Sequence, residues 1–243
     1  MYGIGEVKTS LSNTDHTQLN CGMGLYDKNK VYYMNDVDGK VIVDGKRCTV
    51  LSKEGYENTA VLTLGDKKYN VVKMPDGKYW LAEELDWLAD GITLITSGNA
   101  TYSIPAACYC NYVNTGLGLL YNKHAIALLG SILPVGWRIS TENDWLNLLT
   151  SIGGNDSTHI AKLKSSKLSS AGHWVTPGTD VYGFDLRCTG YRTTAGGFIT
   201  DRYSFYTSTK VNDNYRRGTI QNSSSCTFDA FEYPFYCVRL VKD

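Results

Sequence analysis

The chain has 243 residues, of which 42% are hydrophobic, and its 24 Lys and Arg residues balance its 24 Asp and Glu residues. This composition is typical of a globular protein, and the lack of a basic excess argues against a nucleic-acid partner. No stretch approaches the roughly 18 apolar residues that a membrane span requires, so membrane insertion is not expected. The plentiful Tyr, Gly, Ser and Asn suit recognition loops and an ordinary β-rich fold equally well.

The first part of the chain indicates short strands joined by tight turns. Asp-Gly pairs begin at Asp38, Asp44 and Asp76. This pair favours type I′ hairpin turns, because both central positions of such a turn need a positive φ. We therefore expect a small β-rich segment over residues 1–69 that docks the protein to its assembly, followed by a larger domain over residues 70–243.

Helical periodicity is confined to the middle of the chain. We expect helices near residues 81–88, 141–152 and 158–168. The second is the strongest, because apolar residues recur at i, i+3, i+4 and i+7 from Trp145, and a Thr-x-x-Asp start resembles a capping box. After about residue 170 the pattern returns to short strands. The order of strands, helices and strands predicts an α+β fold.

Five short motifs follow one another in the C-terminal part of the chain. They are DGKYWLAEEL (76–85), GLLYN (118–122), LPVGWRISTENDW (133–145), GYR (190–192) and YCVR (236–239). In this order and spacing they resemble the Fibrobacter succinogenes major paralogous domain, a family common in Bacteroidetes, over roughly residues 70–242. The resemblance implies a C-type-lectin-like fold, related to that of formylglycine-generating enzymes. The family also includes hypervariable display proteins.

The cysteines do not form an obvious framework. Seven are present, with irregular spacing, and the Cys-x-Cys at Cys108 and Cys110 has no second pair at zinc-site spacing. Leu133 and Leu240 stand where the resembled family has Cys. A bridge between those two positions is therefore not expected, and we predict buried, reduced thiols.

The sequence offers little support for catalysis. It contains no H-E-x-x-H or G-x-S-x-G motif, and it lacks the Glu-Pro-Asn and Gln-Pro-Asp motifs of calcium-dependent lectins. We expect no catalytic residue, cofactor or metal site. Two alternatives stay open, a thiolate pair of Cys188 with His173, and Cys226 with Cys237 as a formylglycine-type cysteine pair.

Large aromatic and charged motif residues have a structural interpretation. Trp80, Trp137 and Trp145 are expected to pack in the core, each with a partner for its indole N–H. Arg138 and Arg239 are expected to make internal contacts with carboxylates or carbonyls, because the guanidinium presents a rigid fork of donors.

Recognition is assigned to the late loops. Six residues between about 193 and 225 are expected to gather on one exposed face that contacts a host glycan or protein receptor: Arg202, Tyr203, Tyr206, Asn214, Tyr215 and Arg217. The lack of a secretory leader after Met1 favours a bacteriophage virion protein, such as a head fibre, tail or capsid decoration protein. Such a protein would be a homo-oligomer attached to other virion proteins through its N-terminal segment. The alternatives are a bacterial cell-surface adhesin or lipoprotein and a formylglycine-generating-type enzyme.

Overall fold

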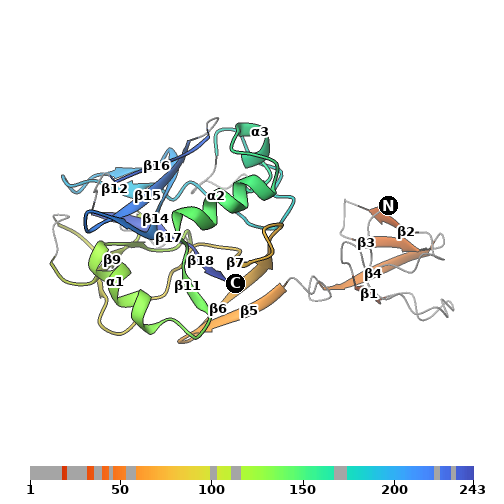
Figure 1. The fold of residues 1–243 in the computed structure, drawn as a ribbon. Coiled ribbons are helices and arrows are strands. Elements are labelled where there is room, and N and C mark those ends of the chain that lie inside the picture. The colour runs from red at the N-terminus through yellow and green to blue at the C-terminus, as the bar shows by residue number, and fades with distance from the viewer. Residues whose placement is uncertain are drawn as a thin grey trace. The chain divides into compact units, whose positions relative to one another are not determined.

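The structure is a computed structural model that describes residues 59–98, 103–110, 116–166, 174–221, 225–230 and 234–243, together with the backbone of the four strands that precede them (Figure 1). The chain divides into two compact units, residues 1–60 and 61–243. The expected boundary at residue 69 falls inside a strand of the second unit, Lys67–Lys73.

The first unit contains a four-stranded sheet in the order β1-β4-β3-β2. Its strands are β1 (Gln18–Asn20), β2 (Tyr32–Asn35), β3 (Lys40–Val43) and β4 (Lys46–Ser52). Strands β2, β3 and β4 pair antiparallel, whereas β1 pairs parallel with β4. The Asp-Gly turns expected at Asp38 and Asp44 lie between these antiparallel strands but outside the described residues.

The second unit begins with a five-stranded sheet in the order β11-β18-β7-β6-β5. The strands are β5 (Thr59–Leu64), β6 (Lys67–Lys73), β7 (Tyr79–Leu81), β11 (Trp137–Ile139) and β18 (Leu240–Lys242). The last strand of the chain therefore lies between strands from its middle and its beginning. Motif residues far apart in sequence become neighbours, as when Val241 pairs with Trp80 and Arg138.

A larger, nine-stranded sheet follows the order β16-β15-β14-β17-β10-β9-β8; in addition, β12 pairs with β17, and β13 pairs with β12. Its strands are β8 (Thr93–Leu94), β9 (Ala106–Cys108), β10 (Leu120–Tyr121), β12 (Tyr191–Arg192), β13 (Phe198–Ile199), β14 (Arg202–Val211), β15 (Asn214–Gln221), β16 (Cys226–Asp229) and β17 (Phe235–Val238). The longest strands, β14 and β15, form a hairpin whose turn residues Asn212 and Asp213 have positive φ.

Three helices accompany the sheets in the described part of the chain. Helix α2 (Glu142–Ser151) confirms the strongest helical prediction, and Thr141 and Asp144 form the expected capping box. Helix α3 (Ser157–Ile160) is shorter than expected. Helix α1 (Lys123–Ile132) was not anticipated. Asn122, which directly precedes it, caps its start by accepting a hydrogen bond from the amide of Ala125.

Two expectations about the fold are wrong. The segment 81–88 is not helical, because Leu81 completes strand β7 and the following residues run as irregular backbone. The α+β class with a C-type-lectin-like domain is also contradicted, because eighteen strands and only three helices are described and the curled sheets resemble a β-sandwich more closely. The apolar spacing of a short segment such as 81–88 fits either a helix or a buried strand. Here the pairing of Leu81 within the sheet excludes the helix.

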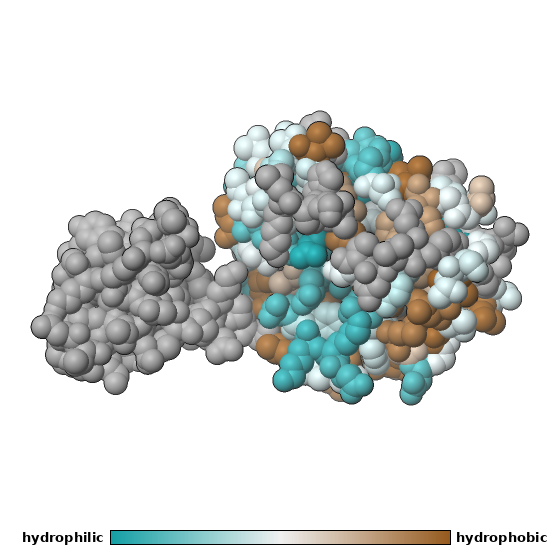
Figure 2. Space-filling model, turned by 180° about the vertical axis from the view of Figure 1, so that it is seen from behind, coloured by the Kyte–Doolittle hydropathy of each residue, from teal (hydrophilic) through white to brown (hydrophobic). Residues whose placement is uncertain are grey.

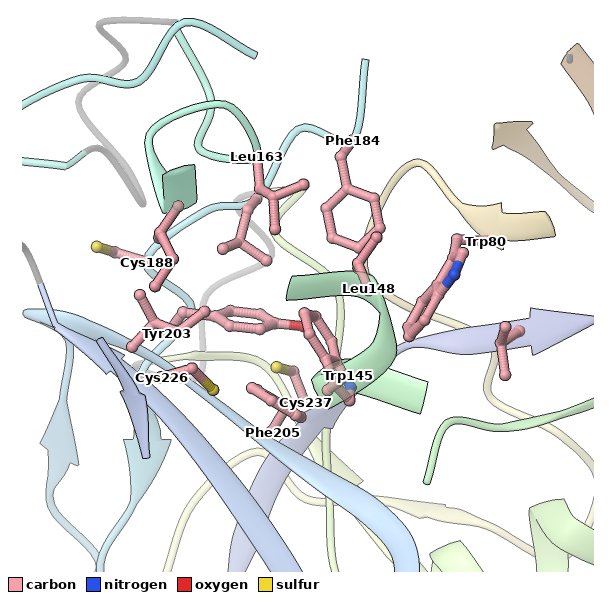
Figure 3. Packing of buried hydrophobic residues seen from close by; sticks show 14 of the residues in the cluster. Trp80, Trp145, Leu148, Leu163, Phe184, Cys188, Tyr203, Phe205, Cys226 and Cys237 are labelled. Carbon is pink, nitrogen blue, oxygen red and sulfur yellow. The ribbon is translucent and has the colours of Figure 1, made fainter. Parts of the chain in front are cut away.

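The core lies against both faces of the larger sheet. Along β17 the alternating side chains enter two clusters, with Phe235 and Cys237 in one and Tyr236 and Val238 in the other. Figure 3 shows the first cluster around Trp145, which is fully buried as expected, with its ring centroid 5.1 Å from that of Trp80. Trp137, in contrast, is only partly buried.

Candidate functional site

Two charged motif residues meet in the centre of the second unit. Glu84 follows strand β7, and Arg239 links strands β17 and β18; both side chains are buried. Arg239 donates from Nη2 to the Oε1 atom of Glu84, and from Nη1 to the carbonyl oxygens of Leu81 at 2.8 Å and Phe184 at 2.9 Å. Its guanidinium also lies 4.5 Å from the ring centroid of Phe184. The expectation of internal carboxylate and carbonyl contacts for Arg239 is thus confirmed.

The network continues through neutral groups. The hydroxyl of Tyr203 donates to the second carboxylate oxygen of Glu84 at 3.0 Å. Cys237 accepts a hydrogen bond from Thr189 at 3.2 Å and donates to the carbonyl of Ser204 at 3.0 Å. Burial raises the pKa of Tyr203 and that of Cys237 well above their ordinary values. Both groups therefore stay protonated at neutral pH, which suits structural hydrogen bonding and not nucleophilic attack.

A second ion pair fixes the start of helix α2. Arg138 donates to both carboxylate oxygens of Asp144, and Lys78 donates to one of them at 2.8 Å. The backbone amide of Thr141 donates to the same carboxylate at 2.7 Å. Burial alone would raise the pKa of Asp144, but these hydrogen bonds outweigh it and hold that pKa well below its usual range. The internal carboxylate contact expected for Arg138 is confirmed.

A shallow polar pocket lies beside the central network. Its cavity volume is only about 30 Å³, and it is lined by Glu83, Glu84, Asp86, Gly116, Leu117, Gly118, Asp185 and Arg187. Gly118 has a positive φ, and a Cβ atom there would lie 2.6 Å from the Cβ atom of Glu84. The motif glycine therefore lets this loop approach Glu84 closely.

The charged groups of the pocket are positioned by neighbours. Asp86 accepts hydrogen bonds from Lys67 and, at 2.6 Å, from the hydroxyl of Tyr69. Arg187 donates from Nε to Asp185 at 2.9 Å. The pocket thus presents carboxylate acceptors and guanidinium donors side by side. Sequence reasoning missed this site. A usable signal was Glu84 next to the apolar Leu85, because a Glu that becomes buried requires a partner.

The recognition face expected from the late loops is not formed as predicted. Tyr203, Tyr206 and Tyr215 are all buried, so they do not project from an exposed surface. Tyr203 enters the cluster around Trp145, whereas Tyr206 and Tyr215 enter the opposite cluster. The physical reason is that β14 and β15 both lie between other strands of the sheet and send side chains into a core cluster on each face, so their tyrosines fill the core.

The polar members of that expected set lie closer to the surface. Arg217 donates from Nε and Nη2 to the carboxylate of Asp229 at 2.6 and 2.9 Å, and its guanidinium lies over the ring of Tyr236. Arg202 pairs with the neighbouring Asp201. Asn214 begins β15 directly after the hairpin turn and is partly exposed. The structure thus brings Arg217 together with Tyr206 and Tyr215, but not with Tyr203.

The thiols of the described region are buried. Cys108, Cys110, Cys188, Cys226 and Cys237 are free and buried, as the buried-thiol prediction requires. Burial raises the pKa of Cys188 and of Cys226 to about 12. His173, the other member of one proposed thiolate pair, lies outside the described residues.

Within the ranges that the structure describes, no group of three or more His, Cys, Asp or Glu residues is arranged to hold a metal ion. None of the described helices is long and apolar enough to cross a membrane.

These features define a β-rich domain whose signature residues build its interior. The YWLAEEL motif supplies Glu84, the GLLYN motif supplies the glycine against it, and the YCVR motif supplies Arg239. The chain belongs to the Fibrobacter succinogenes major domain family, whose sequence pattern matches residues 72–242. Comparison with curated proteins and with solved structures finds no match.

Proposed function

We propose that this chain is a non-enzymatic binding and display protein, in which the second unit is a rigid support for a recognition surface. One observation carries the proposal: the chemically capable side chains of the family motifs are engaged in internal contacts. Glu84 and Arg239 bind each other, and Arg138 binds Asp144. The cysteines that would serve as nucleophiles are buried, and their raised pKa disfavours the thiolate.

The pocket beside Glu84 is the candidate contact site for a host glycan. Hydroxyl groups both donate and accept hydrogen bonds, so a sugar suits a site that offers carboxylate acceptors next to guanidinium donors. Glu83, Asp86 and Arg187 provide these groups at the pocket wall. The cavity is small and polar, so it would hold a hydroxyl-bearing edge of one sugar unit in a longer surface polysaccharide.

A bacteriophage virion is the proposed setting, with the protein as a head fibre, tail or capsid decoration component attached through its N-terminal segment. Display proteins in the family support this assignment. A bacterial surface adhesin is the alternative, and it would use the same recognition chemistry.

Binding of purified full-length chain to capsular and cell-wall polysaccharides from Bacteroidetes species tests the proposal. Biolayer interferometry should detect binding to at least one polysaccharide. Arg187→Ala and Glu83→Gln should each weaken it by tenfold or more, whereas Arg202→Ala, which removes a surface Arg paired with an adjacent Asp, should not. Equal binding by all variants would exclude the pocket, and shortened polysaccharide after incubation would exclude a non-enzymatic role.

A further inference from the structure

The charges that line the polar pocket do not cancel. Three of its four carboxylates form an ion pair with a cation: Glu84 with Arg239, Asp86 with Lys67, and Asp185 with Arg187. Glu83 is the fourth. Its Oε1 atom accepts a hydrogen bond from the backbone amide of Asn70 at 3.0 Å, and none of the cations in the described part of the chain pairs with it. The pocket therefore carries one negative charge in excess, and that charge lies on Glu83.

The cavity admits a small polar group and not a whole sugar ring. Its volume is about 30 Å³, whereas a single water molecule needs roughly 10–15 Å³ on the same measure. A protonated amino group and a hydroxyl group are both close to a water molecule in size, so both fit. Size therefore does not distinguish an amine from a hydroxyl, and the charge of the pocket decides between them.

The excess charge favours an amine. An ammonium group donates hydrogen bonds without accepting any, and hydrogen bonds that involve an ionised group are roughly twice as strong as neutral ones. A hydroxyl group would bind Glu83 without balancing its charge, and a carboxylate would place a second negative charge beside it. Arg187 does not reverse this order, because Asp185 accepts a hydrogen bond from its Nε atom at 2.9 Å and balances its charge.

The rest of the molecule imposes no charge preference of its own. The formal net charge of the chain is zero, so long-range attraction favours neither a cationic nor an anionic ligand. On the face of the second unit seen in Figure 2, hydrophobic and hydrophilic residues are interspersed. Selection between charged sugars therefore depends on the groups that line the pocket.

We propose that the pocket selects a sugar unit with a free, protonated amino group over its neutral and acidic counterparts. This inference rests on the glycan binding proposed above and names the class of sugar. The ammonium group donates to the carboxylate of Glu83, and hydroxyl groups of the same ring accept from Arg187. A lysine side chain of a partner protein also presents an ammonium group, but it lacks acceptors close to the amine, which a sugar ring carries on the adjacent carbons.

NMR titration of the full-length chain with simple glycosides tests the proposal. The probes are the β-methyl glycosides of glucosamine, glucose, N-acetylglucosamine and glucuronic acid, at a mildly acidic pH where the sugar amine is protonated. The glucosaminide should shift the amide resonances of residues 116–118, which line the pocket. It should bind about threefold or more tightly than the glucoside, as a partly exposed ion pair allows, and the glucuronide should bind most weakly.

Glu83→Gln should remove this preference. The amide keeps the side-chain volume and an acceptor for Asn70 but not the charge, so the glucosaminide and the glucoside should then bind with equal dissociation constants. Asp213→Asn is the matched control, because it removes one carboxylate from the β14–β15 turn, where Asn tolerates the positive φ. It should keep the wild-type order of affinities.

The outcomes separate this inference from the proposed function. A glucoside or glucuronide that binds at residues 116–118 as tightly as the glucosaminide would overturn the selection for an amine and leave the sugar site standing, as would a preference that survives Glu83→Gln. Tighter binding of Nα-acetyl-lysine methylamide than of the glucosaminide would instead assign the pocket to a protein partner. If none of the glycosides shifts these resonances near its solubility limit, both the selection and the glycan site are wrong.

Discussion

The buried pair of Glu84 and Arg239 makes the sharpest prediction about stability. Glu84→Gln preserves the side-chain volume but leaves the Arg239 guanidinium buried without its counter-charge. The carboxylate now accepts hydrogen bonds from Arg239 and from Tyr203. Hydrogen bonds to a charged group contribute about 1.5–3 kcal/mol each, and breaking a buried pair typically costs about 3–5 kcal/mol. We expect the free energy of unfolding to fall by about 3–5 kcal/mol, a large share of the roughly 5–15 kcal/mol typical of a domain.

Urea unfolding followed by tryptophan fluorescence measures this change, because Trp80 and Trp145 lie in the adjacent core. Glu83→Gln is the matched control, since Glu83 is partly exposed and accepts a hydrogen bond from the backbone of Asn70. Its cost should stay below about 1 kcal/mol.

A double-mutant cycle separates the pair from its surroundings. Arg239→Met alone leaves the Glu84 carboxylate buried without its cation, so it should destabilise the fold about as strongly as Glu84→Gln. The combined variant should be more stable than the sum of the two single costs predicts, because neither buried charge then remains. Additive costs, or a loss below about 1 kcal/mol for Glu84→Gln, would refute the assigned coupling.

Three further outcomes are expected from the same fluorescence assay. Trp145→Ala should cost about 3–5 kcal/mol, whereas Leu146→Ala, at a 41% exposed position of the same helix, should cost far less; similar losses would contradict the core assignment. Gly190→Ala should prevent stable folding, because its Cβ atom would lie 1.7 Å from the backbone oxygen of Ile199. In Gly77→Ala, the control, the Cβ atom would meet no atom within 4 Å, so this variant should cost only the strain of its positive φ. The cations around Asp144 hold its folded pKa below the unfolded value of about 4, so its stabilisation is present above that pH and lost as the pH falls below it. Asp144→Asn should flatten this acid-side loss, and an unchanged pH profile would show that Asp144 does not cause it.

Local sequence signals predicted the parts of the fold that depend on local contacts. Helix α2 was recognisable because its start is a capping box and its apolar residues follow the helical period. The burial of Trp145 follows from that period directly. Helix α1 had a weaker signal, an Asn before an apolar run, and its cap at Asn122 also bonds the backbone of Ala106, which no local pattern reveals.

Tertiary pairing explains the predictions that failed. The 81–88 segment has apolar spacing suitable for a helix, but Leu81 pairs with Val71 in a sheet that the final strand of the chain completes. The tyrosines of β14 have the composition of a recognition surface, yet that strand lies inside a sheet covered on both faces. Tyrosine serves in either place, because its ring is apolar and its hydroxyl needs only one partner, so composition could not separate the two.

The buried ion pair also bears on where recognition can evolve. Glu84 and Arg239 are 155 residues apart in the chain, and each leaves an uncompensated charge in the core if the other is displaced. Incorrect pairings of β7 with the C-terminal strands are thereby disfavoured, which we regard as the reason that both residues fall within family motifs. Because Glu84 and Arg239 are needed for folding, they are poorly placed to be substituted when the ligand changes. Under the function that we propose, changes in binding specificity should therefore arise at Glu83, Asp86 and Arg187 on the pocket wall, where substitution leaves the central charge pair intact.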